Sequence, residues 1–161
     1  MKGVDICDTI KRKGGDNVTL ETKAYIDAAV TLLAEGKCDV PVPIVGDSMR
    51  PFLCEGDTVY LNLPPEKLRV GDIALYKRPG ERYTLHRVAK ILSDGYEMLG
   101  DSQITRESVK TKIYAVATSA KIKGRTFSEK SLKWRFYKTV WLKAAPLRPA
   151  IARIRAFVKG A

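Results

Sequence analysis

The chain has few of the histidines and cysteines on which many metal sites and all disulfides depend. It has 161 residues but only one histidine, and its three cysteines show no CxxC pair or other metal-ligand spacing. An odd number of scattered cysteines is not a disulfide framework, so we expect reduced, structural thiols. Because so few ligand sets are available, we also expect no metal site and no cofactor.

Long apolar runs are also missing. No run approaches the roughly 20 residues needed to cross a bilayer. The polar start of the chain, Met1 to Asn17, lacks the apolar centre of a secretory signal. We therefore expect a cytosolic protein. The 45% apolar content suits one globular domain with a core of its own.

Acidic residues are nearly absent from the last quarter of the chain. Residues 1–120 contain 17 Lys/Arg and 17 Asp/Glu, whereas residues 121–161 contain 12 Lys/Arg and the single acid Glu129. The whole net charge of +11 therefore lies in this segment. A neutral body with a basic tail predicts contact with something anionic.

The pattern along the chain predicts four segments. Residues 1–18 are typical of a flexible leader, and residues 19–37 of a helix with a broad apolar face that stops at Gly36. Residues 38–124 are expected to form a β domain, because short β-branched runs alternate there with turns. Residues 125–161 form a basic, aromatic tail that we expect to be helical.

Six runs within the β domain are predicted to be strands. They are Val40–Val45, Thr58–Leu63, Ile73–Lys77, Tyr83–Leu92, Tyr96–Leu99 and Ile113–Ile122. No helical pattern separates them, so we expect a mainly β fold, either a curled antiparallel sheet or a small barrel. Pro41 and Pro43 cannot donate ladder hydrogen bonds, which predicts that their strand lies at an edge.

The tail combines aromatic and basic side chains. Trp134, Phe136, Tyr137 and Trp141 alternate with cations, and a further amphipathic helix is expected beyond Pro146 and Pro149, with Leu147, Ile151, Ile154 and Val158 on one stripe and Arg148, Arg155 and Lys159 on another. One interpretation is peripheral binding of residues 131–159 to an anionic membrane, at its inner face. Another is that the aromatic side chains pack on the β domain. Nucleic-acid binding by the tail is a third, less favoured alternative.

A serine and the single histidine suggest nucleophilic catalysis. Ser48 lies in the segment GDSMRP of residues 46–51, and His86 follows in LHRV of residues 85–88. A serine hydroxyl is a poor nucleophile until a positioned base takes its proton, and His86 is the one imidazole available. Asp101 is the predicted carboxylate that orients this imidazole, with Glu107 as the alternative.

Four boxes in order resemble the superfamily of signal peptidase I and the LexA-type self-cleaving repressors. They are Gly46-Asp47-Ser48-Met49-Arg50-Pro51 with the following Gly56-Asp57, Val70-Gly71-Asp72-Ile73, Leu85-His86-Arg87-Val88 and Leu99-Gly100-Asp101. The resemblance runs from Val40 to Ile122. Bacterial signal peptidases and the repressors carry lysine where this chain has His86, which is similar to the endoplasmic-reticulum and archaeal type. The fuller carboxylate pattern of the family after Gly-Asp is absent.

The resemblance implies a serine endopeptidase that cleaves a leader, signal-like or partner peptide. Ser48 would attack the peptide carbonyl while His86, with an ordinary pKa of about 6.5, acts as base. Met49, Pro43, Ile44 and Val45 are the expected substrate-binding residues, because an open strand edge beside the nucleophile can pair with an extended peptide. The alternative is a self-cleaving or catalytically degenerate LexA-like regulatory module, for which Ala34 and Ala144-Ala145 are the candidate cleavage sites.

Overall fold

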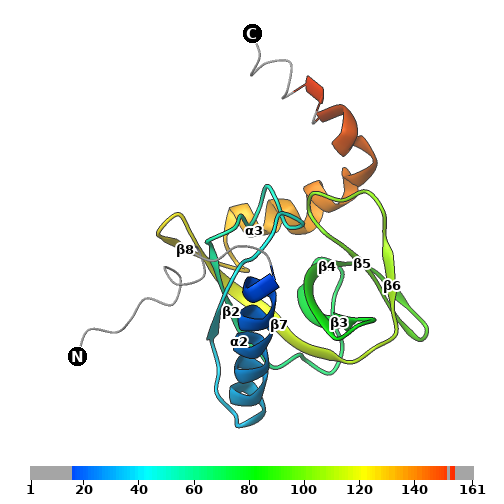
Figure 1. Ribbon diagram of the computed structural model, residues 1–161. Helices are drawn as coiled ribbons and strands as arrows, with labels where there is room; N and C mark the ends of the chain where they lie inside the picture. Colours follow the sequence, from blue (N-terminus) through cyan, green and yellow to red (C-terminus); the bar gives the residue numbers. More distant parts are fainter. Residues whose placement is uncertain (1–15, 152, 155–161) are drawn as a thin grey trace.

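The first element that the structure describes is a helix beside the sheet, drawn in blue in Figure 1. The computed structural model describes residues 16–151 and 153–154. Helix α2 spans Asp16–Ala34, so helical structure begins earlier than residue 19, where the sequence predicted it. The rest of the predicted leader, residues 1–15, lies outside the described residues.

The helix ends at the predicted glycine and packs on the first strand. Gly36 has a φ of 83°, and its amide donates to the carbonyl of Leu33 at 3.0 Å. A left-handed glycine at this position satisfies helix carbonyls that would otherwise lack donors. Leu33 and Ala29 are buried against the core that includes Val40 and Val42, and this contact fixes the helix beside the edge of the sheet.

Eight strands form one antiparallel sheet. They are β1 (Val40–Pro43), β2 (Thr58–Asn62), β3 (Ile73–Arg78), β4 (Arg82–Leu92), β5 (Gly95–Leu99), β6 (Glu107–Val109), β7 (Ile113–Ile122) and β8 (Arg125–Ser128). Their order is β1-β2-β7-β3-β4-β5-β6, with β8 paired to β7 (Figure 1). The mainly β fold is confirmed, as a curled sheet that does not close into a barrel. The edge position of the Pro41 and Pro43 strand is also confirmed.

Two short strands were missed by the sequence analysis. Strand β6 has three residues and carries a glutamate and a serine, so it shows little apolar alternation. Strand β8 lies in what was predicted to be the start of the tail. It follows a two-residue turn in which Lys123 and Gly124 have φ values of 48° and 80°. Positive φ at both positions is typical of hairpin turns, and Lys-Gly is a weaker signal for them than Asn-Gly or Asp-Gly.

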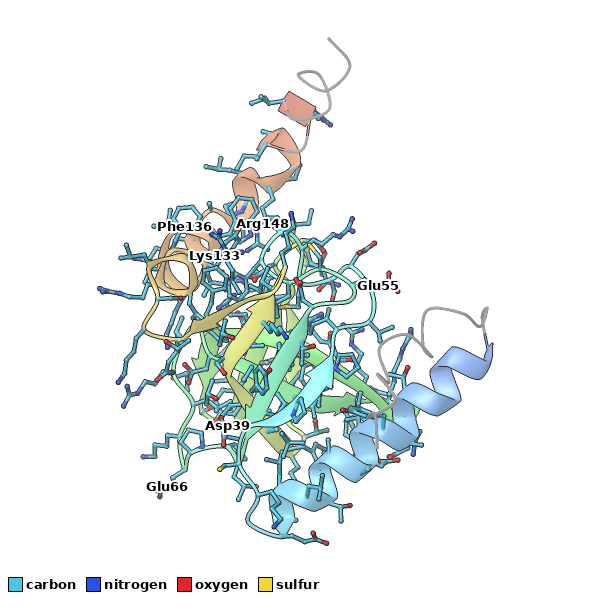
Figure 2. The ribbon with its side chains drawn as sticks, turned by 90° about the vertical axis from the view of Figure 1, so that its left-hand side faces the viewer. Asp39, Glu55, Glu66, Lys133, Phe136 and Arg148 are labelled. Carbon is cyan, nitrogen blue, oxygen red and sulfur yellow. The ribbon has the colours of Figure 1, made fainter. Side chains whose placement is uncertain are left out.

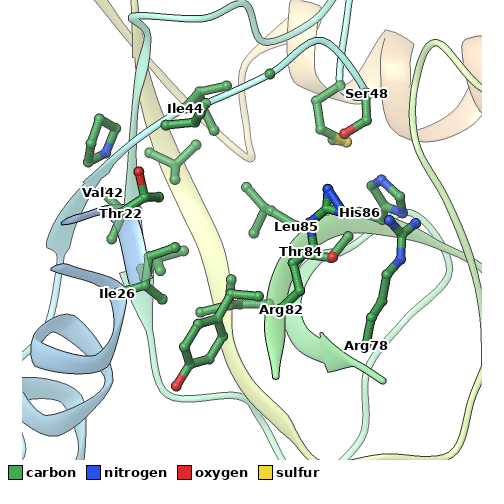
Figure 3. A pocket seen from close by; sticks show the side chains of 18 of the residues that line it. Thr22, Ile26, Val42, Ile44, Ser48, Arg78, Arg82, Thr84, Leu85 and His86 are labelled. Carbon is green, nitrogen blue, oxygen red and sulfur yellow. The ribbon is translucent and has the colours of Figure 1, made fainter. Parts of the chain in front are cut away.

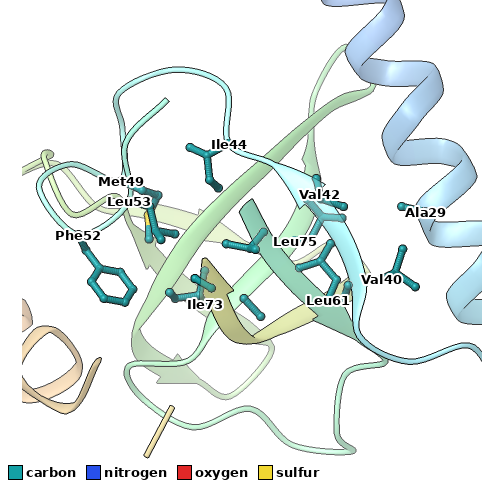
Figure 4. Packing of buried hydrophobic residues seen from close by; sticks show 14 of the residues in the cluster. Ala29, Val40, Val42, Ile44, Met49, Phe52, Leu53, Leu61, Ile73 and Leu75 are labelled. Atoms are coloured by element: carbon teal, nitrogen blue, oxygen red, sulfur yellow. The ribbon is translucent and has the colours of Figure 1, made fainter. Parts of the chain in front are cut away.

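The main core lies between the sheet, helix α2 and the loop that follows β1 (Figure 4). Phe52 and Leu53 from this loop are fully buried, as are Leu61 and Ile73 from the strands. Full burial of each such side chain contributes about 1.5–3 kcal/mol relative to its exposure. The loop that carries the candidate nucleophile is therefore anchored in the core.

The tail packs its tryptophans against the β domain. It comprises α3 (Leu132–Phe136), the π-helical turn η1 (Tyr137–Trp141) and the 3-10 turn η2 (Ala145–Leu147). Trp134 is 1% exposed and meets the ring of Phe52 edge-on, with 5.1 Å between the centroids. Among the described residues, no helix is long and apolar enough to span a membrane.

The sequence predicted Arg148 on the basic stripe of an amphipathic helix, but the structure buries this residue. It is buried at the same end of the molecule as Lys133 and Phe136 (Figure 2). Its guanidinium donates to the carbonyls of Gly100 at 2.8 Å and Trp141 at 3.1 Å. Burial of an arginine is tolerated when carbonyl oxygens accept hydrogen bonds from its guanidinium. Of these two carbonyls, that of Gly100 belongs to the turn next to Ser48.

Candidate active site

The loop after β1 presents Ser48 at the surface of the core. Gly46 has a φ of 83°, which favours glycine. The amide of Arg50 then donates to the carbonyl of Asp47 at 3.1 Å and closes a tight turn. Met49 is 3% exposed, whereas Asp47 is exposed and Ser48 is half-buried. The buried methionine thus anchors the turn in the core, and the neighbouring Ser48 stays partly exposed at the surface.

His86 is held by a tyrosine from the neighbouring strand. It lies on β4 and is 1% exposed, and its Nδ1 is 3.1 Å from the hydroxyl oxygen of Tyr76 on β3. The register pairs Tyr76 with Thr84, so Tyr76 and His86 are diagonal neighbours on one face of the sheet. Among the described residues, the buried Nε2 of His86 has no hydrogen-bond partner.

The surroundings keep this imidazole neutral. Burial, followed by the charge of Arg78, lowers the pKa of His86 to about 4, and the Glu107 carboxylate partly opposes the shift. Burial, followed by the charge of Glu107, raises the pKa of Tyr76 above its usual value. At neutral pH the pair is therefore an uncharged imidazole beside a protonated phenol.

Glu107 joins this cluster from strand β6. Its carboxylate accepts from the guanidinium of Arg78, with Nε 2.8 Å from Oε1 and 2.9 Å from Oε2, and a further contact from Nη2. These hydrogen bonds lower the pKa of Glu107, and a hydrogen bond with Tyr76 contributes in the same direction. An ionised carboxylate therefore lies next to the tyrosine that holds His86.

Ser48 and His86 line one pocket of about 270 Å³. Figure 3 shows both residues on the same side of it, with Thr22 and Ile26 of helix α2 on the other. The lining also includes every substrate-binding residue predicted from the sequence, namely Met49, Pro43, Ile44 and Val45. The structure thus brings together, around one cavity, residues that are nearly 40 positions apart in the sequence.

Asp101 does not orient His86 in this structure. Its two carboxylate oxygens accept from Arg87, at 3.0 Å from Nε and 2.7 Å from Nη2, and both side chains are fully buried. The physical reason is the alternation of side chains along a strand: His86 and Arg87 are adjacent on β4 and point to opposite faces. An acid bound to Arg87 therefore lies across the strand from the imidazole.

The turn that contains Asp101 instead clamps the nucleophile loop. The amide and the hydroxyl of Ser102 donate to the carbonyl of Ser48, at 2.9 and 3.0 Å. Gly100 allows this approach, because a Cβ at that position would lie 2.5 Å from the same carbonyl oxygen. From the tail, the Trp141 indole donates to the Asp101 carbonyl at 2.8 Å. The turn of Gly100 and Asp101 therefore supports the Ser48 loop through the backbone carbonyl of Ser48.

The family model described as Peptidase S24-like matches residues 9–126. The chain belongs to this family. Among curated proteins, no match to the chain was found. The matched region includes both Ser48 and His86 and ends within β8, so most of the tail lies beyond it.

Several residues at this S24-like site were missed by the sequence analysis. Tyr76 and Arg78 are ordinary strand residues by pattern, and Thr22 and Ile26 belong to a helix that was not expected to line the pocket. A usable signal existed for Tyr76: the Pro79-Gly80 turn predicts a β3–β4 hairpin, whose register places Tyr76 diagonal to His86. Glu107, predicted as the alternative to Asp101, is the carboxylate found in this cluster.

Proposed function

We propose that this S24-like chain is a serine endopeptidase in which Ser48 is the nucleophile and His86 the general base. The observation that carries the proposal is the shared pocket of Ser48 and His86, together with the unpartnered, buried Nε2 of the imidazole. A buried nitrogen without a hydrogen-bond partner costs stability, so its presence suggests a use. Accepting the serine proton is such a use.

The tautomer of His86 follows from its neighbours. The ionised Glu107 can only accept, so in the proposed arrangement the protonated Tyr76 hydroxyl donates a hydrogen bond to that carboxylate. The Tyr76 oxygen then accepts a hydrogen bond from Nδ1–H of His86, which leaves the lone pair on Nε2. Glu107 and Tyr76 thereby take the orienting role that the sequence analysis gave to Asp101.

The reaction then proceeds by proton transfer to and from Nε2. Ser48 Oγ attacks the peptide carbonyl as its proton passes to Nε2, and a backbone N–H at or beside Ser48 stabilises the oxyanion. The imidazolium gives this proton to the leaving amine, and the same nitrogen next activates water to release the acyl group. The Glu107 carboxylate, acting through Tyr76, stabilises the charged imidazole in both steps.

The outer edge of β1 supports an extended peptide as substrate near Pro43 and Val45, which line the pocket. At Pro41 the carbonyl already accepts from the Tyr25 hydroxyl of helix α2. The amide of Ile44 donates to Asp57 and its carbonyl accepts from Gly56, so this residue faces β2. The backbone groups of Pro43 and Val45 consequently point away from the sheet. A Pro43 carbonyl and a Val45 amide offer one acceptor and one donor to a strand that enters the pocket. The family resemblance adds a preference for small residues before the cleaved bond.

Labelling with a fluorophosphonate, read by intact mass, tests the proposal. We expect one adduct on the wild-type protein, no adduct on Ser48→Ala, and a rate reduced by about 10²–10⁴ on His86→Gln. The rate should rise with a midpoint near pH 4 rather than near 6.5, because burial lowers the pKa of His86. A folded wild-type protein without an adduct, or an adduct that Ser48→Ala retains, contradicts the assignment.

A catalytically degenerate or self-cleaving module is the second candidate. The described backbone weighs against the predicted self-cleavage sites, since Ala34 ends helix α2 and Ala145 begins η2, where it is buried. Peptidases of this kind act on extended chains, which neither site offers. A fragment that accumulates during days of incubation of wild type, but not of Ser48→Ala, would establish self-cleavage.

A further inference from the structure

The tail has two apolar faces, and only one of them is covered. Trp134 and Trp141 face the β domain and are buried. Leu132, Phe136 and Val140 are 82%, 47% and 54% exposed. Their spacing of four residues places these three side chains along one side of the helical segment, which we call the outer face. Further along, Leu147 and Ile154 are exposed by 61% and 63%.

Two exposed cations lie near the outer-face residues in sequence. Arg135 and Lys143 are exposed and lie between or beside its three apolar residues in sequence. Within the described part of the tail, Lys138 is the cation that takes part in an ion pair, with Asp72. Glu129 is the single acidic residue of the tail, so most of this charge is not neutralised from within the tail.

We propose that the outer face docks on an anionic lipid surface. Apolar side chains flanked by cations are the composition of interfacial helices, in which the apolar side enters the headgroup boundary and the cations meet lipid phosphates. The net charge of +11 disfavours pairing of this face with a second copy of the chain. Of the three apolar residues of the outer face, only Phe136 has an aromatic ring on which a nucleotide base could stack, which argues against single-stranded nucleic acid.

Docking would also hold the pocket in a fixed orientation to the membrane. The tail is tied to the Ser48 loop through two hydrogen-bonded steps: Trp141 donates to the Asp101 carbonyl, and Ser102 donates to the Ser48 carbonyl. A tail fixed at a surface therefore fixes the loop as well. This inference goes beyond the peptidase proposal and does not depend on it, because binding can be measured on Ser48→Ala.

Vesicle co-sedimentation of the full chain tests the docking surface. The probes are vesicles of phosphatidylcholine alone and of phosphatidylcholine mixed with phosphatidylserine. The test variant carries Leu132→Ser, Phe136→Ser and Val140→Ser, which removes the outer face without changing the charge. The matched control carries Leu32→Ser, Leu63→Ser and Ile91→Ser, three exposed apolar residues outside the tail. Circular dichroism confirms that both variants are folded.

We expect the wild-type and control proteins to bind the anionic vesicles and the outer-face variant to bind at least about tenfold more weakly. Arg135→Gln with Lys143→Gln should weaken binding to anionic vesicles and reduce its salt dependence. Equal binding by the outer-face variant would overturn the proposal, as would the absence of vesicle binding by the wild type. Tail-dependent binding to duplex DNA without vesicle binding would assign the tail to nucleic acid instead.

Discussion

Strand β4 separates two buried polar centres that differ in how fully their atoms are satisfied. On one face, Arg87 and Asp101 form a charge pair whose guanidinium also donates to the Gly71 carbonyl at 2.9 Å. On the other face, His86 bonds to Tyr76 through Nδ1 and has no described partner at Nε2. The saturated centre supports the fold, whereas the unsaturated one has capacity left for a reaction.

The largest effect is expected when the acid of the saturated centre is removed. Asp101→Ala should lower the free energy of unfolding by about 3–5 kcal/mol, because Arg87 is left as an unpaired buried charge. Urea denaturation measures the loss. In the double variant Arg87→Leu with Asp101→Ala, part of the stability should return. A loss below about 1 kcal/mol in the single variant would show that Asp101 is not structural.

The unsaturated centre should make stability depend on pH. The folded pKa of His86, about 4, lies below the unfolded value of about 6.5. As pH falls from 6.5 towards 4, only the unfolded chain gains this proton, so the free energy of unfolding should fall by about 3 kcal/mol. Above pH 6.5 the effect is absent.

The chain has one histidine, so the interval from pH 6.5 to 5 reports mainly on His86. At lower pH the carboxyl of Glu107, whose pKa is lowered in the fold, adds a loss of its own. Denaturation midpoints between pH 5 and 8 provide the measurement, with His86→Gln as the control. A wild-type profile that is flat from pH 6.5 to 5 would contradict burial of a neutral imidazole.

The partner of the imidazole can be tested separately from its burial. Tyr76→Phe removes the hydroxyl next to Nδ1 and should reduce fluorophosphonate labelling of Ser48 roughly 10- to 100-fold, because the productive tautomer is no longer favoured. Tyr83→Phe is the matched control, since Tyr83 lines the same pocket but donates to Asp27 at 2.7 Å.

Glu107→Gln should act in the same direction as Tyr76→Phe and shift the pH profile of labelling, because the carboxylate opposes the lowering of the His86 pKa. A merely structural role for Tyr76 would change stability without changing that profile. If Tyr76→Phe and Tyr83→Phe reduce labelling equally, the proposed route from Glu107 to His86 is wrong.

The sequence was informative where one local motif carries the feature. The serine box predicted the loop of Ser48, and the prolines predicted an edge strand. The sequence placed Asp101 at His86, whereas the structure places its carboxylate at Arg87, because the partner of an acid depends on which face of β4 each neighbour occupies. Box order does not encode this, although the alternation of His86 and Arg87 along the strand does.

Contacts that depend on the pairing of distant strands could not be predicted from the sequence. Glu107 comes to Tyr76 only because the three-residue strand β6 completes the sheet, and this strand has no apolar alternation to reveal it. The tail was similarly ambiguous. Its helical period does not tell which apolar face is buried, and Trp134 packs on Phe52, which lies in a loop far from it in the sequence.

The smallest expected effect concerns the link between the two centres. Ser102 belongs to the turn supported by Arg87 and Asp101, yet its hydroxyl donates to the carbonyl of Ser48 at 3.0 Å. Ser102→Ala removes this bond but retains the one from the Ser102 amide at 2.9 Å. Stability should fall by no more than about 1 kcal/mol, because the residue is exposed.

Labelling of Ser48 should nevertheless slow by about two- to fivefold in Ser102→Ala. A loop that is held less firmly lets the Ser48 Oγ occupy a wider range of positions, so fewer of them suit the attack. Ser108→Ala, another exposed serine, is the control and should change neither quantity. Labelling at the wild-type rate would mean that the amide alone holds the loop. The saturated centre would then act on the nucleophile through the backbone of its turn, and the Ser102 side chain would have no part in the coupling.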